Sequence, residues 1–148
     1  MSAVNAIYHI VINTHCRRMT IPELNCDQLY RYIAGTIRNN NCTVYAINGI
    51  ANHIHILVNL HPSTSLSNLV RDIKVSSNQW IKIHQASYPE FEGWGKEYGA
   101  FTYALRDKDM VQNYIQRQKE HHKQRSFEDE YQKLVENAGI EWNPGRLT

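Results

Sequence analysis

The chain of 148 residues has few of the features that mark specialised classes of protein. It holds only three cysteines, Cys16, Cys26 and Cys42, and no CxxC pair, which indicates neither a disulfide framework nor a structural zinc knuckle. No stretch approaches the roughly 20 apolar residues of a membrane span, so we expect no membrane partner. The N-terminal residues lack the basic start and long apolar run of a signal peptide, and we therefore expect a cytoplasmic protein.

Glycine and proline are also scarce, with seven and four residues, while 42% of the chain is hydrophobic and 20% is charged. This composition excludes disordered, collagenous and low-complexity chains. The length is that of about one domain, and it is sufficient to bury a hydrophobic core.

A strong excess of one charge is missing as well, because the formal net charge is only +2. Its distribution is uneven: residues 1–125 carry 14 basic and 9 acidic side chains, whereas residues 126–148 carry 2 and 5. The moderately basic body is compatible with nucleic-acid binding. A mixed, solvated surface explains the charges equally well.

Hydrophobic periodicity predicts an alternation of strands and helices. Strands are expected over 4–13, 43–50, 53–60 and 98–105, and helices from Pro22 to the 39–41 asparagine run, from Leu66 to about His84, and from about Asp109. The order β-α-β-β-α-β predicts an α+β, ferredoxin-like split βαβ fold with an antiparallel sheet and an additional C-terminal helix.

The third predicted strand carries two histidines with one residue between them. Because side chains alternate along a strand, His53 and His55 share one face, while Ile54 and Ile56 face the other way. Two imidazoles at this spacing are close enough to bind one cation. The spacing alone is weak evidence, since both rings could instead lie on an exposed sheet face or bond to neighbouring groups.

The last helix carries Tyr114 and Gln118, which are four residues apart and therefore lie on one helical face. This pair could present a nucleophilic phenol beside an amide oxygen that acts as a third metal ligand. A core tyrosine next to a solvated glutamine is the simpler interpretation of these two residues taken by themselves.

Together, three segments resemble a known family. These are His53-Ile54-His55, the helix segment Tyr114–Gln118, and the segment Trp94–Thr102 between them. In this order they resemble the single-tyrosine HUH transposases of small bacterial insertion sequences, the IS200-like transposases. The resemblance covers roughly residues 4–125, and on this basis we expect residues 1–125 to form the catalytic domain and residues 126–148 a short helical extension of the same domain.

The resemblance implies an enzyme that cuts and rejoins single-stranded DNA at the ends of a mobile element, near DNA hairpins. It implies that Tyr114 is the nucleophile of a covalent phosphotyrosine intermediate, and that His53, His55 and Gln118 hold Mg²⁺ or Mn²⁺. It also implies a homodimer, in which composite active sites are possible. A cation would neutralise the phosphodiester, but the sequence does not show which base takes the phenolic proton.

Two alternatives remain open. A non-catalytic or domesticated ferredoxin-like protein that binds single-stranded nucleic acid at repeat hairpins would have almost the same sequence. A replication-initiator nuclease or relaxase would use the same chemistry, but such proteins normally have larger or differently ordered domains than 148 residues allow.

Five further basic residues are of interest. Arg17, Arg18 and Lys74 are predicted to contact DNA phosphates, which attract cations without regard to base sequence. His121 and His122 follow Tyr114 by about two helical turns. Either could contact a phosphate or the metal, but we interpret both as surface histidines.

The acidic C-terminal segment, residues 126–148, predicts a short amphipathic helix. Phe127, Tyr131, Leu134 and Val135 have helical spacing and could pack on the body of the protein or on a second subunit. A largely solvated tail with one docking face is the simplest interpretation of this segment.

Overall fold

The computed structural model describes residues 2–144 and contains four strands and five α-helices. They are β1 (Ile7–Asn13), α1 (Cys26–Asn39), β2 (Thr43–Ile50), β3 (His53–Asn59), α2 (Leu66–Ile83), β4 (Gly99–Tyr103), α3 (Lys108–Gln116), α4 (Gln118–His121) and α5 (Phe127–Asn137). The strands form one antiparallel sheet in the order β2-β3-β1-β4. This arrangement confirms the predicted α+β, ferredoxin-like fold.

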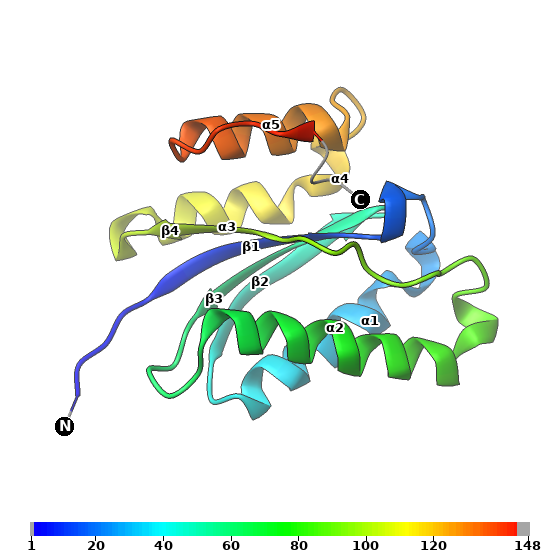
Figure 1. Cartoon of the computed structure of the whole chain (residues 1–148), viewed down its shortest axis with the longest axis horizontal. Coiled ribbons are helices and arrows are strands. Elements are labelled where there is room, and N and C mark those ends of the chain that lie inside the picture. The colour runs from blue at the N-terminus through cyan, green and yellow to red at the C-terminus, as the bar shows by residue number, and fades with distance from the viewer. Residues whose placement is uncertain (1, 145–148) are drawn as a thin grey trace.

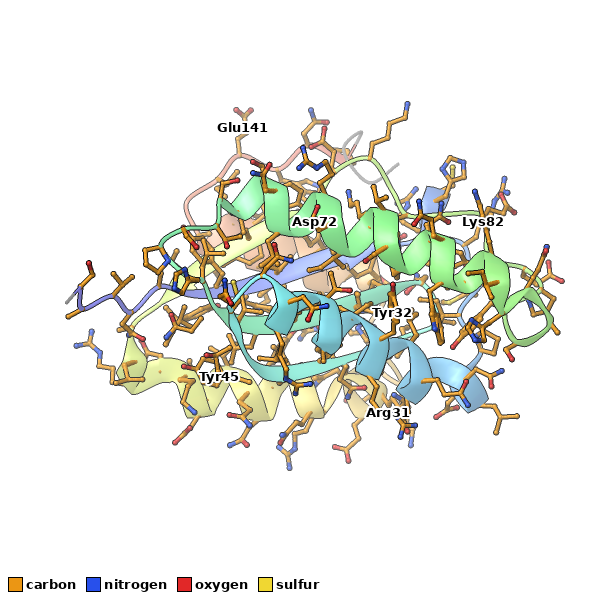
Figure 2. The ribbon with its side chains drawn as sticks, turned by 90° about the horizontal axis from the view of Figure 1, so that it is seen from below. Arg31, Tyr32, Tyr45, Asp72, Lys82 and Glu141 are labelled. Carbon is orange, nitrogen blue, oxygen red and sulfur yellow. The ribbon has the colours of Figure 1, made fainter. Side chains whose placement is uncertain are left out.

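Helices α1 and α2 cover one face of the sheet (Figure 1). Isoleucines at alternating positions of β1 and β3 face these helices, and apolar side chains at helical spacing on α1 and α2 pack against them. The principal members of this core are Ile10, Ile12, Ile54, Ile56, Leu29, Ile33, Ile37, Leu69 and Ile73. Figure 2 shows the two helices side by side, with Tyr32 of α1 on the side towards α2, where its ring stacks on that of Trp80 at 5.1 Å.

The opposite face of the sheet is covered by α3 and α5 (Figure 1). Leu57 of β3 packs with Val111 and Ile115 of α3. Further along the same face, a second cluster joins Val11 and Phe101 of the sheet to Phe127 and Val135 of α5. The sheet is therefore buried on both faces, and the C-terminal helix packs on the body of its own chain.

Several predicted boundaries change in the structure. Strand β1 begins at Ile7, and α1 begins at Cys26 after a 3₁₀ turn over Glu23–Asn25. The prediction of one continuous last helix was wrong, because the helix is broken at Arg117. There the amide of Arg117 donates to the carbonyl of Tyr114, three residues earlier, at 3.2 Å, which is the tighter 3₁₀ pattern that often ends a helix. Among residues 2–144, no helix is long and apolar enough to cross a membrane.

Gly49 of β2 lies close to the backbone of β3. A β-carbon built at this residue would lie 2.1 Å from the carbonyl oxygen of His53. A side chain at Gly49 would therefore force β2 and β3 apart next to His53, where β3 begins. By contrast, a β-carbon at Gly35 in α1 would meet nothing within 4 Å.

These two glycines form a matched pair for a stability measurement. Gly49→Ala should lower the free energy of unfolding by about 1–3 kcal/mol, because the backbone of β3 cannot move aside freely. Gly35→Ala should raise it by about 0.5–1 kcal/mol, because alanine costs less backbone entropy within a helix. Urea denaturation of both variants measures the two changes in unfolding free energy. Equal changes in the two variants would contradict the close approach at Gly49.

Candidate active site

Strand β3 places His53 and His55 on the face of the sheet that α3 and α5 cover. Both side chains are completely buried. The Nδ1 atom of His53 bonds to Oδ1 of Asn52 at 2.8 Å, so its Nε2 atom points towards the helices. The predicted alternation along this strand is therefore present, but neither histidine lies on an exposed surface.

Helix α3 brings Tyr114 to the same place. Val111 and Ile115 anchor the helix on the sheet, and the Tyr114 ring lies edge-on to the ring of His55, with 5.9 Å between centroids. The phenol donates a hydrogen bond to Oε2 of Glu130. Tyr114 and the histidine pair thus meet within one chain.

Gln118 also reaches this cluster despite the helix break that precedes it. Its side chain is fully buried. Its Oε1 atom lies 3.1 Å from Nε2 of His53, and its amide nitrogen donates to Oε2 of Glu130 at 2.8 Å. The structure therefore brings together all four residues that the sequence analysis assigned to the nucleophile and the metal site.

Glu130 of α5 is the central residue that the sequence analysis missed. Its carboxylate is only 2% exposed, and its Oε1 atom lies 3.0 Å from Nε2 of His55 and 3.3 Å from Nε2 of His53. A signal did exist, since Glu130 follows Phe127 by three residues and precedes Leu134 by four, and it therefore shares the apolar face predicted for this helix.

The interpretation of His122 as a surface residue was wrong, whereas His121 is half-buried. The His122 side chain is 4% exposed, and its Nε2 atom lies 3.1 Å from Oε1 of Glu130 and 3.1 Å from Oε1 of Gln118. The His121 ring stacks on the ring of Tyr114, with centroids 4.9 Å apart. The turn at Arg117 and the docking of α5 enclose His122.

Burial and proximity shift the pKa values of this cluster. Burial raises the pKa of Glu130, but hydrogen bonds with His122, His53 and His55 outweigh it and hold that pKa well below its usual range. Burial lowers the pKa of His53 to about 4. Burial, together with the Glu130 carboxylate, raises the pKa of Tyr114. At neutral pH the site therefore contains an anionic carboxylate, a neutral His53 imidazole and a protonated phenol.

Three of these residues fit a divalent cation. One ligand atom from each of His53, His55 and Glu130 lies within 4.8 Å of the other two. Two imidazole nitrogens and a carboxylate oxygen are ligands that divalent metals commonly take in proteins, and the anionic oxygen reduces the cation's charge. The donor set therefore fits the metal that the resemblance implies, with Glu130 added to the expected residues.

The three predicted DNA-binding residues lie outside this cluster and have protein partners. Arg17 pairs with Glu128 of α5 at 3.1 Å, and Arg18 bonds to Glu92 at 2.7 Å. The ammonium group of Lys74 donates to the backbone carbonyls of residues 95–97 at 2.9–3.4 Å. Contact of these residues with DNA stays a prediction.

Two histidines on a central strand, facing a tyrosine on the helix that follows the sheet, are the arrangement expected of a single-tyrosine transposase. The model of the family described as "Transposase IS200 like" matches residues 2–118, and the chain belongs to this family. Glu130 and α5 lie beyond the matched residues. A search of curated proteins gave no match.

Two solved structures share the fold. A candidate transposase from Deinococcus radiodurans R1 is 19% identical, with a TM-score of 0.61 over 79% of this chain and 93% of the other. A REP-associated tyrosine transposase bound to a REP hairpin is 16% identical, with a TM-score of 0.60 over 82% of this chain and 72% of the other. At these identities the likeness concerns the fold.

Glu130→Gln should lower the unfolding free energy of the metal-free protein by about 3 kcal/mol near neutral pH, because the buried imidazoles lose their anionic partner. The depressed pKa of Glu130 stabilises the fold above the unfolded value of 4.5, and this contribution is lost as the pH falls below that value. Urea denaturation in EDTA should therefore show a difference in unfolding free energy between wild type and variant, and this difference should become smaller as the pH falls.

Glu136→Gln is the matched control, since Glu136 is an exposed residue of the same helix. Its effect should stay within about 0.5 kcal/mol. A difference between wild type and Glu130→Gln that is the same at every pH would contradict the ionised state of Glu130.

Proposed function

We propose that this protein cuts and rejoins single-stranded DNA at mobile-element ends through a covalent bond between Tyr114 and DNA. The observation that carries the proposal is the meeting of the Tyr114 phenol with the His53 and His55 imidazoles around one buried carboxylate, that of Glu130. Membership of a transposase family supports the DNA substrate. The relative bound to a REP hairpin supports a substrate that contains a hairpin.

The proposed metal is Mg²⁺ or Mn²⁺, held by Nε2 of His53 and of His55 together with Oε1 of Glu130. Gln118 was the third ligand implied by the resemblance, and its carbonyl oxygen, 3.1 Å from His53 Nε2, is a further candidate oxygen. When bound, such a cation neutralises and polarises the scissile phosphate. The buried rings hold the ligand nitrogens in place before DNA arrives.

Glu130 supplies the base that the sequence analysis left unassigned. Its two oxygens face different groups, because Oε1 faces the imidazoles while Oε2 accepts the phenolic hydrogen of Tyr114. The lowered pKa of Glu130 and the raised pKa of Tyr114 keep the proton on the phenol in the resting site, so we expect it to pass to Oε2 only as the phenol oxygen bonds to phosphorus and loses its basicity. A phosphorus–oxygen bond to Tyr114 forms, one backbone phosphorus–oxygen bond breaks, and the departing DNA strand keeps its oxygen as a hydroxyl group after protonation.

The covalent product preserves the energy of the phosphodiester bond. A hydroxyl group on another DNA end can therefore attack the phosphotyrosine and restore a phosphodiester, which releases Tyr114 without an external energy source. Hydrolysis by water would lose this energy. Exclusion of bulk water from a site with completely buried histidines suits strand transfer better than hydrolysis.

The same burial sets a requirement for access. Phe127 of α5 stacks on the His53 ring at 4.2 Å between centroids and covers it, so we expect this side chain to move before a DNA phosphate approaches the ring. Phe127 itself is only 2% exposed. The proposed reaction therefore includes an opened state in which the Phe127 side chain has moved off the His53 ring, while Glu130 keeps its contacts with the imidazoles and with Tyr114.

A homodimer remains part of the proposal, but it is not needed to assemble the site. Tyr114 and His55 come from the same chain and lie 5.9 Å apart between ring centroids. A composite site would instead pair the histidines of one subunit with the tyrosine of the other. The single-chain arrangement favours an enzyme whose monomer contains every proposed reacting group.

The decisive experiment is covalent capture. Incubation with single-stranded DNA that carries a candidate element end and hairpin should give a protein–DNA adduct with Mn²⁺, and EDTA should abolish it. Tyr114→Phe should reduce the adduct by at least about 1,000-fold, because it removes the nucleophilic oxygen. Denaturing gels and mass spectrometry measure the adduct and locate it.

Tyr32→Phe is the control variant, because Tyr32 lies on the opposite face of the molecule (Figure 2). It should form the adduct at the wild-type rate. Tight binding of the DNA without any adduct would instead support the alternative, a non-catalytic protein that binds single-stranded hairpins.

A further inference from the structure

His9 of β1 is a buried histidine for which the mechanism above has no use. It is 1% exposed and lies on the same face of the sheet as His55. Its Nε2 atom lies 2.6 Å from Nδ1 of His55, and the two rings stack with centroids 4.9 Å apart. His9 therefore contacts the ring edge of His55 that faces away from Glu130.

The two candidate metal-binding histidines each have one partner at Nδ1. For His53 that partner is the side-chain oxygen of Asn52, which can only accept a hydrogen bond. The Nε2 atom of His53 faces the oxygens of Gln118 and Glu130, and with a hydrogen on Nδ1 it presents a lone pair to a cation there. For His55 the partner is His9, and a neutral imidazole can accept or donate at Nε2, depending on its tautomer.

Hydrogen-bond accounting links the tautomers of the two rings. In the metal-free protein, His55 Nε2 lies 3.0 Å from the Glu130 carboxylate, so this nitrogen carries a hydrogen and donates it. The Nδ1 atom of His55 then accepts from Nε2 of His9. If His55 Nε2 binds a cation, its hydrogen must sit on Nδ1 instead, and His9 Nε2 must become the acceptor.

The surroundings of His9 permit this exchange. Its second nitrogen, Nδ1, has no hydrogen-bond partner within residues 2–144. It adjoins a cavity of about 170 Å³ that is lined by His9, Tyr103, Tyr114 and three apolar side chains. A water molecule fits such a cavity and can donate or accept there. No fixed protein group therefore holds His9 in one tautomer.

We propose that His9 is a positioning residue of the metal site, which accepts the Nδ1 hydrogen of His55 and so directs the His55 Nε2 lone pair to the metal. Metal binding then converts both rings from the Nε2–H to the Nδ1–H tautomer. The inference rests on the metal site of the proposed function. It extends that site to a residue on a different strand.

Mn²⁺ affinity, measured by electron paramagnetic resonance without DNA, tests the role of the acceptor. His9→Phe keeps a ring but removes the acceptor, and it should weaken binding by about 10–100-fold. His9→Gln places an acceptor oxygen near the position of Nε2 and should bind within about threefold of wild type. His61→Phe, at an exposed histidine, should bind as wild type does.

Long-range proton–nitrogen NMR of the imidazoles tests the tautomers directly in the wild-type protein. Both His9 and His55 should change from Nε2–H to Nδ1–H on addition of Mg²⁺, and His53 should be Nδ1–H in the metal-bound protein. This measurement needs no folded variant, so it remains decisive even if His9→Phe fails to fold. Unchanged tautomers in the metal-bound protein would overturn the inference.

The two experiments separate this inference from the proposed function. Wild-type affinity in His9→Phe, or equal weakening in His9→Phe and His9→Gln, overturns the role of His9 while the metal site stands. Absence of Mn²⁺ binding by the wild type overturns both. The expected affinities and tautomers without any DNA adduct would support His9 and contradict the transposition chemistry.

Discussion

A single buried carboxylate organises the functional half of this molecule. Glu130 is 2% exposed, and a carboxylate so far from water stays ionised only where hydrogen bonds replace its hydration. The His55 ring of β3, the His122 ring that follows α4, the amide of Gln118 and the phenol of Tyr114 provide those bonds. This one group therefore connects α5, the Tyr114 phenol and the imidazoles of β3 to one another.

Much of the fold and part of the site could be predicted because they follow local periodicity. The two-residue period of β3 places His53 and His55 together, and the helical period places Tyr114 near Gln118. The family resemblance then assigned these residues their expected roles. Such patterns need only residues that are close in the sequence.

The remaining site residues depend on contacts between distant parts of the chain. Glu130 meets His55 across 75 positions, and His9 meets it across 46. Helical spacing places Glu130 on the apolar face of its segment, but no local pattern identifies the residues that it contacts, and an acidic residue in an acidic segment is usually solvated. The helix break at Arg117 could not be predicted either, because Tyr114 and Gln118 have good helical spacing. The burial of His122 depends on the docking of α5, which no local pattern predicts.

Helix α5 has a thermodynamic consequence of its own. Only three of its residues, Phe127, Glu130 and Val135, are buried, whereas α1 and α2 contribute many side chains to the main core. Elements with few buried contacts open by local unfolding at a lower free energy than the whole domain. The fraction of time for which the histidines meet solvent is therefore set by the local stability of one helix. Mutations on α5 can therefore change the availability of the site more than they change the stability of the sheet and its main core.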